Sequence, residues 1–130
     1  MPTTAAKAVI DFIEDQDLLA NCAETGAYLR GRLEELKEKH ELIGDVRGMG
    51  LLQAVELVED RATKKPATAQ TAMALEAARE NRLLIGKGGM YGNVLRISPP
   101  MNVGRGDVDQ FIELLDKSLA ACGAMAGRSA

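Results

Sequence analysis

The sequence predicts an α+β domain: a small, mostly antiparallel sheet with helices packed on one face. The main observation is the hydrophobic period, which changes along the chain in the order helix, helix, strands, helix, strand, strand, helix. The length of 130 residues fits one domain around one core. Because 46% of the residues are hydrophobic and 27% are charged, the composition is that of a globular domain.

Two helices are predicted before the first strand. Residues 5–15 place Val9, Ile10 and Ile13 on one side of a first helix. From about residue 17, a second helix has one apolar stripe and an opposite charged face. The stripe consists of Leu18, Cys22, Leu29, Leu33 and Leu36. The single histidine, His40, follows a basic last turn, so we interpret it as a residue of the helix terminus and not as a catalyst.

The middle of the chain is β-rich. Residues 43–58 predict one long or two short strands, with Gly48 and Gly50 permitting a tight turn or a bulge. Residues 59–65 are polar and indicate an exposed loop. Pro66 is predicted to be the first residue of a helix, which Asn81 closes in a left-handed conformation.

The last third predicts two short strands and a helix. Residues 83–85 are predicted to be a strand, 86–89 a mobile loop, and 94–98 a second strand that two prolines end. Apolar residues at a 3.6-residue spacing predict a final helix over 107–119. Because Gly123 is a natural helix stop, we expect a domain over residues 1–123 and a flexible tail over 124–130.

Composition excludes several classes of function. A net charge of −3 gives no electrostatic reason to expect a nucleic acid or an anionic membrane as partner. No apolar stretch approaches the roughly 20 residues of a membrane helix, and no signal peptide is evident, so we expect a cytoplasmic protein with reduced Cys22 and Cys122. The run at 86–89 is glycine-rich but lacks the spacing of a phosphate-binding loop.

Three segments carry a resemblance to a known family. Residues 45–51, Asp-Val-Arg-Gly-Met-Gly-Leu, are followed by Val55-Glu56-Leu57, and residues 95–101 read Leu-Arg-Ile-Ser-Pro-Pro-Met. Together with the helix over 107–119, they resemble the C-terminal small domain of class III pyridoxal-phosphate (PLP) aminotransferases. The resemblance covers nearly the whole chain, and residues 83–88 look closest to the alanine–glyoxylate-like branch.

The resemblance implies that a large domain, outside this chain, binds PLP and supplies the lysine that forms the Schiff base. PLP chemistry needs that amine, so we expect the isolated chain to be inactive. Lys64 and Lys65 are interpreted as solvated charges, and Lys87 matches a variable loop. No catalytic, cofactor-binding or metal-ligating residue is therefore predicted within the chain.

Arg96 is the predicted substrate-binding residue. The resemblance places an arginine of this segment near the substrate carboxylate, and a guanidinium can grip a carboxylate with two hydrogen bonds. We expect its apolar neighbours to hold it firmly. The alternative is that Arg96 bridges a carboxylate elsewhere in the fold, or in a dimer, and anchors its strand.

We therefore expect the small domain of an aminotransferase, which orients the substrate carboxylate and closes the active site of the complete enzyme. Its partners would be the large domain, of the same or a separate chain, and further copies in a homo-oligomer. The alternative is a free-standing, non-catalytic binding or assembly module derived from such a domain.

Overall fold

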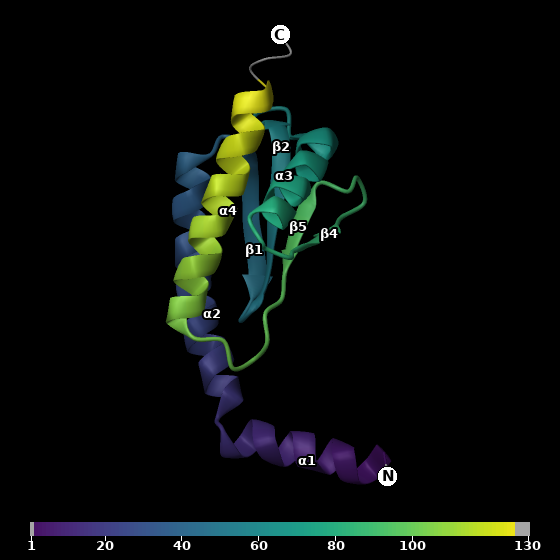
Figure 1. Ribbon diagram of the computed structural model, residues 1–130, viewed down its shortest axis with the longest axis vertical. Coiled ribbons are helices and arrows are strands. Elements are labelled where there is room, and N and C mark those ends of the chain that lie inside the picture. Colours follow the sequence, from purple (N-terminus) through teal and green to yellow (C-terminus); the bar gives the residue numbers. More distant parts are fainter. Residues whose placement is uncertain (1, 127–130) are drawn as a thin grey trace.

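The structure, a computed structural model, describes residues 2–126. Two helices precede the first strands, and two further helices follow later in the chain (Figure 1). In order they are α1 (Pro2–Asp15), α2 (Leu18–Lys39), β1 (Ile43–Met49), β2 (Leu52–Asp60), β3 (Lys65–Pro66), α3 (Thr68–Glu80), β4 (Gly86–Gly88), β5 (Val94–Ile97) and α4 (Arg105–Ala126).

The sheet is antiparallel, with the strand order β1-β2-β5-β4 and with β3 paired to the end of β2. Helices α2, α3 and α4 pack against one face of this sheet, as Figure 1 shows. The predicted α+β class is therefore confirmed. Among residues 2–126 no helix covers the opposite face of the sheet, and below we call it the open face.

The core lies between the sheet and the three helices that cover it. Its fully buried side chains come from α2, β2, β5 and α4 and include Leu29, Leu33, Val55, Leu57, Leu95, Leu115 and Leu119. The apolar stripes predicted for the second and last helices thus supply a large part of the core. Strand alternation adds to it, because every second residue of β2 and β5 points to the helices, and Ala74 of α3 contributes as well.

The β1–β2 hairpin needs its glycines. Gly48 and Gly50 have positive φ angles of 154° and 51°, so the predicted tight turn is confirmed. Helix α2 approaches this turn through Gly26, where an added Cβ would overlap with the backbone of Gly50. Two bare backbones are therefore in contact at the point where α2 crosses the end of the hairpin.

Helix α1 extends away from the rest of the domain and packs mainly against the start of α2 (Figure 1). Its apolar residues Val9, Ile10 and Phe12 are 59%, 55% and 54% exposed. Asp17, with a left-handed φ of 48°, separates α1 from α2. The first helix is thus formed as predicted, but its apolar side covers none of the core.

Two predictions of secondary structure in the second half are wrong. Residues 83–85 are not a strand; the strand is Gly86–Gly88, in place of the predicted loop, because these residues pair with β5. Pro66 does not begin a helix, since it lies in β3 opposite Val58, and α3 begins at Thr68. The predicted loop over 59–65 is shorter, since β2 runs to Asp60.

Helix ends also differ from the predictions in two places. Asn81 has a φ of −79°, and the left-handed residue after α3 is Arg82, with a φ of 62°. Helix α4 passes Gly123 and ends at Ala126, so the first three residues of the predicted tail are helical, and 127–130 lie outside the described residues. His40 is the C-cap of α2, as predicted.

Candidate functional site

The open face of the sheet brings two arginines into one row. Arg47 on β1 pairs with Ala54 on β2, Ala54 pairs with Arg96 on β5, and Arg96 pairs with Gly86 on β4. Residues paired directly across antiparallel strands share a face. The row therefore contains two guanidinium groups, and only a methyl group and a glycine stand beside Arg96.

Arg47 is neutralised by its neighbours. Its guanidinium donates to Asp45 at 2.8 Å and to Glu56 at 2.6 Å, and Glu56 also accepts a hydrogen bond from Asn93 at 3.3 Å. The hydrogen bond from Arg47 holds the pKa of Asp45 below its ordinary value, and the two carboxylates raise the pKa of Arg47. The charge of Arg47 is thus compensated by two carboxylates within the fold.

Arg96 is different, because it is exposed and forms no hydrogen bond or ion pair with another side chain among residues 2–126. The sequence predicts that its apolar neighbours hold it firmly, but Leu95 and Ile97 point to the opposite face and belong to the core. The alternative in which Arg96 bridges a carboxylate within the fold is not seen in the described residues.

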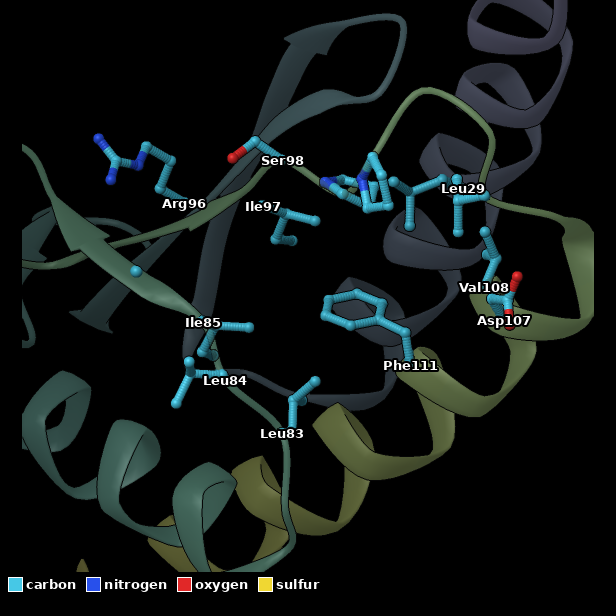
Figure 2. A pocket seen from close by; sticks show the side chains of 14 residues that line it. Leu29, Leu83, Leu84, Ile85, Arg96, Ile97, Ser98, Asp107, Val108 and Phe111 are labelled. Carbon is cyan, nitrogen blue, oxygen red and sulfur yellow. The ribbon is translucent and has the colours of Figure 1, made fainter.

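A cavity of about 410 Å³ lies at the sheet edge next to Arg96, between the segment before β4, the turn after β5 and the first turns of α4 (Figure 2). Its lining is mainly apolar and includes Leu83, Ile85, Ile97, Pro99, Val103, Val108 and Phe111. Figure 2 shows the guanidinium of Arg96 directed away from Ile85 and Phe111. Asp107 also lines the cavity, but its carboxylate accepts the backbone N–H of Gly104 at 3.0 Å.

The geometry of the hairpin, of β5 and of α4 agrees with a match to a known family. Residues 2–119 match the family described as Aminotransferase class-III. The chain belongs to the class III aminotransferases. The motif segments around Val46 and Arg96 lie on β1 and β5, the two strands that flank β2 in the sheet.

Relatives within the family are enzymes of greater length. The chain is 50% identical over 118 residues to "Alanine--glyoxylate aminotransferase 2 homolog 2, mitochondrial" of Arabidopsis thaliana, and it covers 25% of that protein and 91% of its own length. It is 41% identical to a leucine/methionine racemase of Thermococcus litoralis, covering 89% of this chain and 26% of the racemase. The chain thus spans about a quarter of the length of these relatives.

A solved structure shows the same fold. An amine transaminase from an uncultivated Pseudomonas species, in a PLP-bound form, superposes with a TM-score of 0.82 at 35% identity. The match covers 91% of this chain and 27% of the transaminase. The chain therefore has the architecture of about a quarter of that transaminase.

The candidate lysines of this class III domain are exposed or lie in ion pairs. Lys64 and Lys87 are exposed, and Lys65 pairs with Glu59 at 2.6 Å, which raises the pKa of the lysine. Lys37 is the most buried lysine side chain in an ion pair, but it lies on α2, 3.8 Å from Glu34. A Schiff-base lysine is typically desolvated, whereas Lys64, Lys65 and Lys87 are exposed.

The described residues contain neither a candidate metal site nor a candidate membrane span. Among residues 2–126 no group of three or more acidic, histidine or cysteine side chains is placed to hold a metal ion. Within the same range, no helix combines the length and the apolar character of a membrane span. His40 contacts Asp116 at 2.6 Å and joins α2 to α4, away from the open face.

Sequence reasoning found Arg96 but missed its neighbours. Ala54 and Gly86 are 42 and 10 residues away along the chain and become adjacent only through strand pairing. The alternation of β5 could have placed Arg96 opposite Leu95 and Ile97. No signal in the sequence gives the register that brings Gly86 beside it.

Proposed function

We propose that this chain is the small domain of a PLP-dependent aminotransferase and that Arg96 binds the carboxylate of the amino-acid substrate in the complete enzyme. The observation that carries the proposal is the exposed guanidinium of Arg96 on the open face, without an ionic partner among residues 2–126. A guanidinium with free donors suits a carboxylate, which accepts two parallel hydrogen bonds.

PLP is the cofactor that the family and the PLP-bound relative imply. When bound, it supplies an electron sink for chemistry at the substrate's α-carbon. The surroundings of the lysines support the view that the cofactor and its lysine belong to another part of the enzyme, and that this chain alone is inactive. Within the complete enzyme this domain orients the substrate and excludes water when it closes over the site.

The reaction type is set elsewhere in the protein. Aminotransferases and a racemase share this domain at 41–50% identity, so their different chemistries do not depend on its fold. A carboxylate-binding arginine serves both reactions equally, because both substrates are amino acids. The complete enzyme is proposed to be a homo-oligomer, and a cytoplasmic location stays a prediction, since the Arabidopsis relative is described as mitochondrial.

The first test is a titration of the purified chain with PLP, followed by absorption spectroscopy. We expect no stable band from a cofactor bound to lysine, and no spectral response when an amino acid is added. A band that responds to an amino acid would show that a lysine of this chain performs the chemistry, and it would overturn the proposed division of roles.

The second test uses a hybrid enzyme, in which this chain replaces the matching segment of the Arabidopsis relative. Replacing Arg96→Ala should raise the KM for the amino-acid substrate on the order of 10- to 100-fold, the effect of losing charge-assisted hydrogen bonds. Arg79→Ala is the matched control, because it removes an exposed arginine from α3 that bonds only Glu76 among the described residues. An unchanged KM in the Arg96 variant would contradict the carboxylate role.

The alternative function, a free-standing binding or assembly module, is not favoured by the relatives named above, which are enzymes. It would gain support if the chain bound a protein partner while its Arg96→Ala variant retained full binding. The proposed small-domain function remains the better account of an unpaired arginine on an open sheet face.

A further inference from the structure

Arg96 occupies an unusual place in its row of the open face, because both of its cross-strand neighbours are very small. Ala54 stands on one side and Gly86 on the other. In most sheets the side chains opposite an arginine would pack against its stem or cover its donors. Here the two positions paired with Arg96 offer only a methyl group and a bare backbone, which leave its donors uncovered.

Gly86 lies beside the guanidinium of Arg96, at a distance that an added Cβ would close. A Cβ added at Gly86 would lie 3.4 Å from both Nε and Nη2 of Arg96. An alanine methyl would therefore touch the group at ordinary contact distance, and a branched side chain would occupy the space in which the guanidinium lies. The side chain of Arg96 thus leans over β4, toward the outer edge of the sheet.

The backbone does not require glycine at this position. The glycines with positive φ among the described residues are Gly48, Gly50, Gly89 and Gly92, and Gly86 is not among them. Residue 86 lies in a regular antiparallel pair with Arg96. A larger residue could therefore adopt the same backbone conformation. What the glycine provides is the space above the strand, which the guanidinium of Arg96 occupies.

We propose that Gly86 is a positioning residue for Arg96 and that its bare Cα determines where the guanidinium meets the substrate carboxylate. This inference rests on the proposed function of Arg96. A branched side chain at position 86 would lift the guanidinium from the strand and move its two donors away from the carboxylate. Displacements of about 1 Å in a binding geometry can change rates on the order of 100-fold.

Gly88 provides a matched control for Gly86. It lies on the same strand, it pairs with Val94, and the alternation of β4 puts it on the same face. A Cβ added at Gly88 would have nothing within 4 Å, and its φ is also not positive. Substitutions at the two positions therefore change strand propensity alike and differ only in the contact with Arg96.

The test compares Gly86→Ala, Gly86→Val, Gly88→Ala and Gly88→Val in the hybrid enzyme. We expect Gly86→Val to raise the KM for the amino acid on the order of 10- to 100-fold, and Gly86→Ala less than about tenfold. Both Gly88 variants should stay within about twofold of the parent. In the Arg96→Ala background, Gly86→Val should add no further increase, since coupled residues are not additive.

A second readout uses the chain itself. The Nε–H resonance of Arg96, assigned from its loss in Arg96→Lys, should shift in Gly86→Ala and keep its position in Gly88→Ala. This measurement keeps the proposal testable if the valine variant fails to fold. An unchanged resonance in Gly86→Ala would overturn the contact on which the proposal depends.

The outcomes separate the two proposals. If Arg96→Ala leaves the KM unchanged, the proposed function fails and the role of Gly86 fails with it. If Arg96→Ala raises the KM but Gly86→Val and Gly88→Val change the KM equally, only the positioning role of Gly86 is overturned. An increase from Gly86→Val that persists in the Arg96→Ala background would likewise show that Gly86 acts independently of Arg96.

Discussion

The two faces of the sheet have different contents although the same strands form them. On β5, Leu95 and Ile97 point into the core, and Arg96, which lies between them, points to the open face. On β2, Val55 and Leu57 are fully buried, while Ala54 and Glu56 belong to the open face. The comparison indicates that one set of alternating residues stabilises the domain and the other set is available for recognition.

The largest expected effect on stability is on the covered face. Leu33 of α2 is 0% exposed, so Leu33→Ala should leave a cavity and lower the free energy of unfolding by about 2–5 kcal/mol. Leu19→Ala is the control on the same helix, because Leu19 is 69% exposed and its loss should cost less than about 0.5 kcal/mol. Urea unfolding followed by circular dichroism measures both, and equal losses would contradict this assignment of the core.

The next effect concerns the contact between α2 and the hairpin. Gly26→Ala would force a methyl group into the backbone of Gly50, so we expect a loss of about 1–3 kcal/mol from overpacking. Gly31→Ala lies on the same helix with nothing within 4 Å, and it should stabilise the domain by about 0.5–1 kcal/mol. Opposite signs for the two alanines in thermal unfolding would confirm the close approach; equal signs would contradict it.

A smaller effect is expected from pH, through Asp116 on α4. Burial raises its pKa, but bonds to Lys39 and His40 outweigh this, so the pKa lies below the ordinary value of 3.8. A lowered pKa means that the stabilisation is complete above pH 3.8 and is lost as the pH falls through the folded value. Asp116→Asn should remove less than about 1 kcal/mol at neutral pH and flatten the acid limb of the stability profile.

The smallest effect on stability is expected on the open face. Arg96→Ala should change the free energy of unfolding by less than about 0.5 kcal/mol, because the side chain is exposed and has no ionic partner among residues 2–126. Thermal unfolding of the isolated chain measures this directly. A decrease in the free energy of unfolding above about 1 kcal/mol would indicate that Arg96 stabilises the fold, and it would contradict the stated difference between the two faces.

Elements with a strong hydrophobic period were predicted well from the sequence. The stripe of Leu29, Leu33 and Leu36 belongs to a buried helical face, and the last helix is buried through Val108, Ile112 and Leu115. In these segments the local pattern and the tertiary packing favour the same structure. The first helix shows the limit, because Val9 and Ile10 predict a helix but do not say what covers it.

Elements that depend on strand pairing were predicted poorly. Leu83 and Ile85 are residue types that favour a strand, yet they pack against the core without pairing to another strand. The pairing with β5 begins at Gly86. Pro66 has a helix-start signature, but the N–H of Ala67 donates to Leu57 and extends the pairing of β2. Partners so distant in the chain leave no local pattern, and the surroundings of Arg96 escaped prediction for the same reason.

The outer strand β4 has a further consequence for the behaviour of this chain at high concentration. An edge strand exposes backbone groups with which another copy can pair, and this is a route to aggregation. β4 is three residues long, contains two glycines and carries an exposed lysine, Lys87. These features make it a poor template for an incoming strand, so the glycine that leaves room for Arg96 also helps to keep this edge from joining sheets of neighbouring molecules.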